Sequence, residues 1–172
     1  MKKLLIVVDY QNDFVTGSLG FEGARSIASA LRQKIESYRS AGQDVVYTLD
    51  THGEGYLQTQ EGKRLPISHC IKGSEGWKLS SEIAGLLQGC TSFCKGTFGS
   101  LELAKWLEGQ AYDQIELCGV VTNICVLSNA VLCKAALPEA QILVDRTCVA
   151  GADETLNQAT FAVLRGIQVD VL

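Results

Sequence analysis

Three side chains with complementary chemistry each come after a stretch of the sequence that reads as a strand. Asp9 directly follows the run KLLIVV, Lys95 directly follows TSFC, and Cys125 lies a few residues beyond QIELC. A carboxylate can accept a thiol proton, an ammonium group can stabilise the thiolate and keep the carboxylate ionised, and the sulfur can attack a carbonyl carbon. Each residue also has an ordinary alternative, because acids cap turns, lysines are solvated and free cysteines pack as small apolar residues. Taken together, they predict one site.

The segment around Cys125 reads as a strand, a sharp turn and a helix. Residues 114–118 are an apolar run, and apolar residues at helical spacing follow them. Thr122 or Asn123 is expected to cap the helix, which places Cys125 in its first turn. At the positive end of a helix dipole, and with a cation nearby, the pKa of a cysteine falls below its usual value of about 8.5. The expected apolar face of this helix consists of Ile124, Leu127, Val131 and Ala135.

Both histidines of the chain, His52 and His69, lie in residues 51–78. Asp50 ends an expected strand, and side chains two residues apart on an extended segment point to the same side. Asp50, His52 and His69 can therefore converge on one metal ion, with Glu61 or a water completing the ligand set. Such oxygen and imidazole ligands suit Zn²⁺, Fe²⁺ or Mn²⁺. The alternative is a surface loop whose histidines and acids are solvated.

The rest of the chain alternates strands and helices. Residues 3–8 form a continuous apolar run, as in a central parallel strand that is buried on both faces. Further strands are expected at residues 44–49, 91–94, 114–118, 141–144 and 167–171. Helices are expected at residues 24–41, 79–88, 101–107 and 153–164 and after Cys125, with a loop at residues 145–152.

This alternation predicts an α/β fold, a three-layer α-β-α sandwich around a mainly parallel, Rossmann-like sheet of about six strands. The carboxyl ends of parallel strands lie at one edge of the sheet, where open α/β folds bind their ligands. Asp9, Lys95 and Cys125 are therefore expected to meet at that edge. A dinucleotide-binding loop is not expected, because the glycines after the first strand do not fit G-x-G-x-x-G.

Length and charge limit the class of protein. With 172 residues, the chain is long enough for one α/β domain and too short for two ordinary ones. We expect a single domain over residues 1–172, with the metal-binding excursion at about residues 51–78. A net charge of −4 and the lack of a basic run argue against nucleic acid or an anionic membrane as a partner. The expected partner is a small molecule.

The cysteines indicate the cellular compartment. The seven cysteines are an odd number and contain no C-x-x-C pair, which favours reduced thiols over a disulfide framework or a redox motif. The amino-terminal residues run straight into residues 3–8, so no secretory signal is expected. No stretch approaches the roughly 20 apolar residues of a membrane span. The expected location is the cytoplasm.

Five motifs occur in order along nearly the whole chain. They are VVDYQNDF at residues 7–14, DTH at 50–52, HCIKG at 69–73, KGTF at 95–98 and GVVTNICV at 119–126. Together they resemble the isochorismatase-like cysteine hydrolases, a family that includes the nicotinamidases. The resemblance implies a three-layer α/β fold and a catalytic triad of Asp9, Lys95 and Cys125. It also implies a cis peptide bond between Val120 and Val121, and an oxyanion hole formed by the backbone amides of Val121 and Cys125.

The same resemblance implies a metal site. Nicotinamidases bind a metal through an Asp-x-His pair, a later histidine and sometimes a glutamate, and this metal holds the pyridine nitrogen of the substrate. The matching positions here are Asp50, His52, His69 and Glu61. We expect a divalent metal, zinc first, with iron or manganese as alternatives. Phe14 is the expected ring contact for the substrate.

The implied reaction is hydrolysis of a small amide to an acid and ammonia through a thioester. Isochorismatases proper, which cleave a vinyl ether, lack the metal residues and need no cysteine nucleophile, which favours an amidase. Two alternatives stay open. Residues 65–68 lack the aromatic residue that many nicotinamidases place before the later histidine, so another carbamoyl or amide substrate remains, as does a catalytically silent metal-binding interaction module. Relatives form dimers or tetramers, so a homo-oligomer is expected by analogy.

Overall fold

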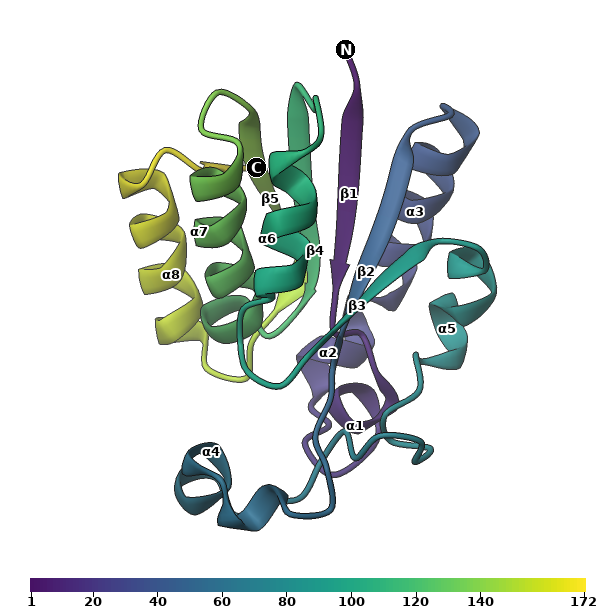
Figure 1. The fold of residues 1–172 in the computed structure, drawn as a ribbon, viewed down its shortest axis with the longest axis vertical. Helices are drawn as coiled ribbons and strands as arrows, with labels where there is room; N and C mark the ends of the chain where they lie inside the picture. Colours follow the sequence, from purple (N-terminus) through teal and green to yellow (C-terminus); the bar gives the residue numbers. More distant parts are fainter.

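The computed structural model describes residues 1–172 and is built on one six-stranded sheet in the order β3-β2-β1-β4-β5-β6 (Figure 1). Every neighbouring pair of strands is parallel, which confirms the predicted sheet. The strands are β1 (Lys3–Val8), β2 (Asp44–Asp50), β3 (Thr91–Lys95), β4 (Gln114–Val120), β5 (Gln141–Ala150) and β6 (Asp170–Val171).

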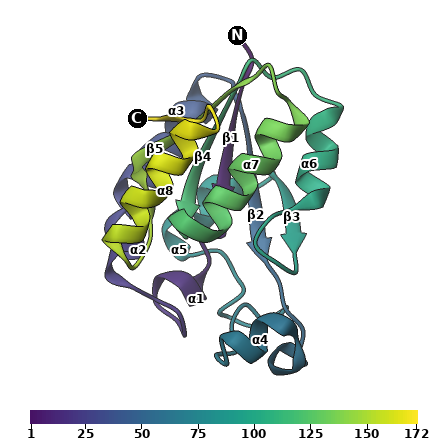
Figure 2. The same ribbon diagram turned by 90° about the vertical axis from the view of Figure 1, so that its left-hand side faces the viewer.

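Helices cover both faces of the sheet. They are α1 (Asn12–Val15), α2 (Glu22–Ser26), α3 (Ala28–Ser40), α4 (Gln60–Arg64), α5 (Ser81–Ala84), α6 (Leu101–Glu108), α7 (Leu127–Ala136) and α8 (Glu154–Gly166). Shorter turns are η1 (Tyr56–Gln58), η2 (Gly85–Leu87) and η3 (Thr122–Val126). Figure 2 shows α6, α7 and α8 side by side over one face of the sheet, while α3 lies behind it. None of the helices is both long and apolar enough to cross a lipid bilayer.

Strand β1 shows why an uninterrupted apolar run suits a central strand. Leu4, Ile6 and Val8 pack into the core beneath α6, α7 and α8, while Leu5 and Val7 pack into the core beneath α3. All five side chains are fully buried, because successive residues of a strand point to opposite faces. The two cores make the three layers, so the predicted α-β-α sandwich is confirmed.

Two predicted helices are interrupted. The helix expected at residues 24–41 begins earlier, at Glu22, and is divided into α2 and α3 at Ile27, whose ψ of −6° departs from helical geometry. The helix expected at residues 79–88 is α5 followed by the 3₁₀ turn η2. In both places the side chains at the break, such as those of Ile27 and Leu87, are buried, so packing against the sheet shapes the backbone.

The prediction of a loop at residues 145–152 is wrong, because strand β5 continues to Ala150. Its register against β4 shifts between Leu117 and Gly119, whose partners on β5 are Val144 and Val149. The residues between these partners bulge outward, and Asp145 Oδ1 accepts a hydrogen bond from the Thr147 amide at 2.8 Å. The polar residues that resembled a loop therefore mark a bulge inside a strand.

The last strand is shorter than predicted. Residues 167–171 were expected to form a strand, but only Asp170 and Val171 pair with β5. Helix α8 ends at Gly166, and Gln168, with a φ of +64°, reverses the chain so that the Val169 amide bonds back to Leu164. This helix ending uses the residues that the apolar pattern had assigned to the strand.

Residues 51–78 leave the sheet at its carboxyl edge and carry η1 and α4, which project away from the layers in Figure 1. The segment returns beside its own start through a parallel bridge between His52 and Ile71. The His52 amide donates to the Cys70 carbonyl at 3.0 Å, and the Lys72 amide donates to the His52 carbonyl at 2.9 Å. This pairing places His52 next to His69, although 16 residues separate them in the sequence.

Candidate active site

The structure brings Asp9, Lys95 and Cys125 together at the carboxyl edge of the sheet. Lys95 Nζ lies 2.6 Å from Asp9 Oδ2 and 3.5 Å from Cys125 Sγ. None of the three residues exposes more than 5% of its surface. The predicted juxtaposition is therefore present, and an ammonium group bridges a carboxylate and a thiol in a dry setting.

Lys95 reaches across the sheet to make these contacts. It ends β3, which is separated from β4 by β2 and β1. Its ammonium group also donates to the Thr97 carbonyl at 3.0 Å and to Asp50 Oδ1 at 3.3 Å. Burial alone would lower the pKa of Lys95, but the carboxylate charges of Asp9 and Asp50 outweigh it and raise the pKa above its usual value. Lys95 is therefore a permanent cation in this site.

Asp9 is held in a single orientation. Its backbone has a φ of +47°, and Thr48 Oγ1 donates to Asp9 Oδ1 at 2.7 Å. Asp9 Oδ2 has Lys95 as its ion-pair partner and otherwise makes no hydrogen bond. Complete burial raises the pKa of Asp9 despite the opposing charge of Lys95. A raised pKa makes this carboxylate a stronger base than an exposed aspartate.

The thiol of Cys125 has a pKa well above its usual value, opposite to the direction predicted from the sequence. Burial is the main cause, the charge of Asp9 adds to it, and Lys95 opposes both. The helix-dipole argument treated the thiol as partly exposed, whereas the structure encloses it. The resting sulfur is therefore a neutral thiol that must lose its proton as it attacks.

The turn that carries Cys125 also differs from the prediction. It is a π-turn, η3, that leads into α7, with Val121 at the cap position and no side-chain cap from Thr122 or Asn123. A π-turn inserts one extra residue into the helix and so rotates the helix that follows. Ile124 and Val131, from the predicted apolar face, are accordingly exposed. The buried face consists of Val126, Asn129, Ala130 and Cys133.

The peptide bond between Val120 and Val121 is cis, as the resemblance implied. Gly119, which precedes it, has a φ of +108°, and a Cβ there would lie 2.1 Å from the Val8 carbonyl oxygen. Only glycine fits this close approach of β4 to β1. The backbone amide of Val121 makes no hydrogen bond within the protein, and Val121 lines the same cavity as Cys125. This free donor is available to a ligand oxygen.

Next to the triad, Asp50, His52 and His69 present their ligand atoms within 4.8 Å of one another. Asp50 Oδ2 lies 2.9 Å from His52 Nε2 and 3.3 Å from His69 Nε2. Glu61 Oε1 lies 3.7 and 3.8 Å from the same two nitrogens. His69 Nδ1 lies 2.8 Å from the Ile67 carbonyl, an outer contact that directs Nε2 inward, as in known metal sites. The donor set fits a divalent cation.

Asp50 links the two groups, because one of its oxygens faces Lys95 and the other faces the two histidines. Burial alone would raise its pKa, but the contacts with His52, His69 and Lys95 lower it well below the usual range. Asp50 is thus an ionised carboxylate. By contrast, burial and the nearby Asp50 charge raise the pKa of Glu61.

Gln11 is a supporting residue to which the sequence analysis gave no role, although it lies in the first motif. Its fully buried amide accepts from the Asp50 backbone amide at 2.8 Å and donates to the Asp50 carbonyl at 2.9 Å. It also donates to the Trp77 carbonyl at 2.8 Å. The two bonds to Asp50 hold its backbone in place from the β1 side, and the third ties Gln11 to the Trp77 segment. Its position two residues after Asp9, on an extended segment, was the available signal.

A cavity of about 220 Å³ connects Cys125 with Asp50, Glu61 and His69. Its lining is mostly apolar and consists of Phe14, Leu19, Phe21, Asp50, Glu61, Leu65, His69, Phe98, Val121, Ile124, Cys125 and Ala152. The structure thus places Phe14 in the cavity, as predicted, with its ring 5.7 Å from that of His69. Phe21 and Phe98 also line the cavity, and the sequence analysis did not predict them there. Phe98 follows Lys95 by three residues within one motif, and its place in that motif was the signal.

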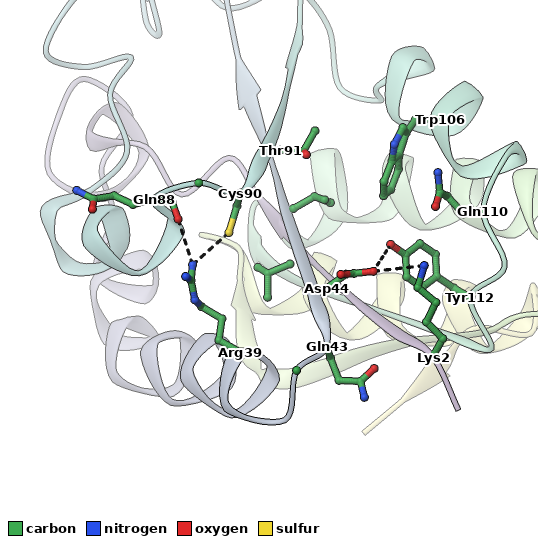
Figure 3. Close-up of a pocket in the computed structure, with 14 residues that line it drawn as sticks. Lys2, Arg39, Gln43, Asp44, Gln88, Cys90, Thr91, Trp106, Gln110 and Tyr112 are labelled. Carbon is green, nitrogen blue, oxygen red and sulfur yellow. Dashed lines mark hydrogen bonds and ion pairs between the residues drawn. The ribbon is translucent and has the colours of Figure 1, made fainter.

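A larger groove of about 740 Å³ lies at the opposite, amino-terminal edge of the sheet (Figure 3). Its charged groups already have partners, because Arg39 donates to backbone carbonyls of the neighbouring loop and Asp44 pairs with Lys2 and Tyr112. No residue lining it forms a nucleophile and base pair. The chemistry of the molecule therefore lies in the smaller cavity.

The chain is similar to known proteins over most of its length. A family model described as the isochorismatase domain matches residues 3–172. An isochorismatase family protein of Bacillus subtilis, PncA, is 34% identical over 143 residues, which cover 76% of this chain and 78% of that protein. The nicotinamidase/pyrazinamidase of Mycobacterium tuberculosis is 28% identical over 172 residues, covering 90% of each chain. A crystal structure of a nicotinamidase/pyrazinamidase from Bacillus subtilis superposes with a TM-score of 0.88, at 27% identity over 99% of both chains.

Proposed function

The chain belongs to the isochorismatase family, and on that premise we propose that it is a cysteine amidase of the nicotinamidase type, converting a small amide to an acid and ammonia. The observation that carries the proposal is the position of Lys95 between Asp9 and Cys125. Cys125 lines the cavity, and so do Asp50, Glu61 and His69 of the neighbouring group. A protein that uses Cys125 only for thiol redox chemistry would need neither Asp9 nor Lys95 beside the sulfur.

The first half of the reaction forms a thioester. Cys125 Sγ attacks the amide carbon while its proton passes to Asp9, whose pKa is raised by burial. Lys95 stabilises the developing thiolate without giving up its own proton. The tetrahedral intermediate then collapses, the carbon–nitrogen bond breaks, and the proton on Asp9 leaves with the amine as ammonia. A second half-reaction, in which Asp9 takes a proton from water that attacks the thioester, releases the acid and restores the thiol.

The oxyanion of both tetrahedral intermediates needs hydrogen-bond donors. We assign this role to the backbone amides of Val121 and Cys125. The support is that the Val121 amide has no partner within the protein and lies beside the nucleophile in the cavity. A donor of this kind contributes about 2.7–4 kcal/mol to lowering the barrier.

We propose that Asp50, His52 and His69 hold a zinc ion, with Glu61 as an outer or fourth ligand. Two neutral imidazoles and one carboxylate are a common ligand set of zinc in enzymes. A bound metal ion would offer its open coordination position to a ring nitrogen of the substrate and so orient the amide. Phe14, Phe21 and Phe98 supply the apolar walls that a small aromatic ring requires.

The same cavity argues against amides that carry a carboxylate, such as carbamoyl amino acids. Lys95 is the cationic side chain nearest the nucleophile, and its ammonium group is already shared among Asp9, Asp50 and the Thr97 carbonyl. With the proposed metal position taken by the ring nitrogen, a substrate carboxylate would lie against the mostly apolar lining without a side-chain cation as its partner. A neutral heteroaromatic amide is therefore the preferred substrate.

The test is ammonia release by the purified protein from nicotinamide, benzamide and N-carbamoylglycine, with and without added zinc. Nicotinamide is expected to be the best substrate, and benzamide, which lacks the ring nitrogen, should be at least about tenfold poorer. Equal rates for the two rings would contradict the metal–nitrogen contact. No ammonia from any of the three would favour another amide or a catalytically silent metal-binding module.

Replacing His52 with alanine should remove bound zinc. Loss of a residue that only supports a metal ligand typically weakens metal affinity by roughly 10–100-fold. Loss of His52, one of three proposed ligands, is expected to weaken it by more than that. The measurement is metal content per chain after dialysis, by elemental analysis. Glu54→Ala removes an exposed acid two residues away and serves as the matched control, with metal content equal to that of the unmodified chain. Full zinc in the His52 variant would refute the ligand set.

Three further proposals concern the setting of the enzyme. We propose that residues 1–172 act as one hydrolase domain, supported by a family match that begins at residue 3 and ends at residue 172. We place it in the reducing cytoplasm, supported by seven cysteines that are all unpaired. We also propose a dimer or tetramer, supported by large apolar side chains exposed on α6, α7 and α8, namely Leu101, Val131, Leu156 and Val163.

A further inference from the structure

Asn129 is a fully buried polar residue on α7, one turn beyond the nucleophile. Its side-chain Nδ2 donates to the Cys125 carbonyl at 2.8 Å and to the Phe98 carbonyl at 3.1 Å. Its Oδ1 accepts from the Ser100 amide at 3.0 Å. Both donor hydrogens and one acceptor position of the amide are thus engaged, and all three partners are backbone groups.

These partners lie on two different segments of the active site. Cys125 is in the η3 turn, which follows β4, whereas Phe98 and Ser100 are in the loop between β3 and α6. Strands β3 and β4 are not neighbours, because β2 and β1 lie between them. Sheet hydrogen bonds therefore do not join the two segments directly, and Asn129 supplies a direct link.

The loop carries two groups that the site needs. Its Thr97 carbonyl accepts a hydrogen bond from Lys95 Nζ at 3.0 Å, and the Phe98 ring forms a wall of the cavity. The loop also lies close against α7, where a Cβ at Gly99 would come within 2.7 Å of Leu132 Cδ1. Phe98 is nevertheless 44% exposed, so its own burial contributes little to holding the loop in place.

Resting on the amidase function proposed above, we propose that Asn129 is a positioning residue. It holds the loop that contains Phe98 and the turn that contains Cys125 in a fixed position relative to each other. Its three hydrogen bonds orient the wall of the cavity and the carbonyl that steadies Lys95 relative to the nucleophile. A misplacement of about 1 Å at a reacting group can cost on the order of 100-fold in rate. Asn129 acts through these neighbours and does not itself face the cavity.

Two substitutions separate the contacts. Asn129→Ala removes all three bonds. Asn129→Ser keeps a hydroxyl that can bond to the Cys125 carbonyl four residues earlier in its own helix, but it is too short to reach Phe98 and Ser100. The serine variant therefore removes the link between the segments with less loss of helix stability, and it serves if the alanine variant fails to fold.

Ser100→Ala is the matched control. The Ser100 hydroxyl caps α6 by accepting from the Leu103 amide at 3.1 Å, whereas the bond to Asn129 uses the Ser100 backbone. Its loss weakens the same region by the amount typical of a helix cap and leaves the three Asn129 bonds intact. A purely structural role for Asn129 would make its variants behave like this control.

The experiment measures kcat and KM for nicotinamide hydrolysis and, separately, the rate at which iodoacetamide labels Cys125, located by peptide mapping. Both Asn129 variants are expected to lose about 10–100-fold in kcat/KM, with kcat falling because Lys95 is less well held and KM rising because the Phe98 wall is loosened. The Cys125 labelling rate should differ from that of the unmodified chain by more than about threefold. Ser100→Ala should stay within about twofold on every measure.

Asn129 variants that match Ser100→Ala in kcat, KM and labelling rate would overturn the positioning role. If the unmodified chain releases no ammonia from any amide, the proposed function fails instead. The labelling comparison then still decides the role of Asn129, because it needs only the thiol and its surroundings.

Discussion

Cys125→Ala is expected to lower kcat for amide hydrolysis by at least about 10⁴-fold, because no other group in the cavity can form the thioester. Loss of a catalytic nucleophile in another hydrolase costs on the order of 10⁶ in kcat. The fold should remain, since the change removes one sulfur from a residue that is 5% exposed. Ammonia release under saturating substrate is the measurement, beside a thermal unfolding curve.

Cys133→Ala is the matched control for this variant. Cys133 is fully buried on the same helix and lies outside the cavity. Its alanine variant removes the same atom from the core at a similar cost in stability and should keep activity close to that of the unmodified chain. Turnover by Cys125→Ala at the rate of the control would rule out the cysteine mechanism.

Asp9→Asn is expected to lower kcat by about 10²–10⁴-fold, the usual contribution of a positioned general base. The amide is nearly the same shape as the carboxylate and can still accept the Thr48 hydrogen bond. It cannot take the thiol proton, and burial, the main cause of the raised pKa of Cys125, is unchanged in this variant. The sulfur would then remain protonated beside the substrate.

The pH profile makes the test of Asp9 specific. The base form of Asp9 is lost as the pH falls through its pKa, and burial raises that pKa above the usual aspartate value. Activity of the unmodified chain should therefore decline on the acid side earlier than an exposed aspartate would predict. The residual activity of Asp9→Asn should lack this decline, whereas Asp44→Asn, at the opposite edge of the sheet, should keep it. An identical acid limb in the Asp9 variant would contradict the assignment.

Asp50 connects the group formed by Asp50, His52 and His69 to Lys95, which affects the choice of variants. Asp50 contacts Lys95 with one oxygen and the two histidines with the other, and Gln11 holds its backbone on both sides. A change at Asp50 therefore perturbs both groups at once. His52→Ala is the cleaner probe of metal binding, because His52 makes no contact with Lys95 or Cys125 among the polar interactions of the site.

Much of the architecture was readable from the sequence because it depends on local rules. The run Lys3–Val8 has apolar side chains on both sides of its pleat, which requires a strand covered on both faces. Strands alternating with helices require a parallel sheet, and a parallel sheet collects its carboxyl ends at one edge. The meeting of Asp9, Lys95 and Cys125, and of Asp50 with His52, follows from these rules together with the family motifs.

Other features depended on residues distant in the sequence. The π-turn at Cys125 rotates α7, so that Asn129 faces inward and Ile124 faces outward, against the phase predicted from helical spacing. The polar residues after Val144 bulge from β5 because β4 continues beside them, a fact that the segment itself does not encode. Phe98 and Phe21 line the cavity through loops whose course local propensity does not specify.

The pKa of the Cys125 thiol depends mainly on its burial, which the local sequence does not specify. The sequence placed a cysteine at a helix start near a cation, which predicts a lowered pKa, but the tertiary structure enclosed the thiol beside Asp9 and reversed the direction. The sequence by itself determined which chemical groups exist and at which strand ends they lie, because backbone geometry and side-chain periodicity act over a few residues. Their burial, the side of the helix on which they lie and the groups that they contact depend on the tertiary structure, because these properties are set by chain segments that meet across the sheet.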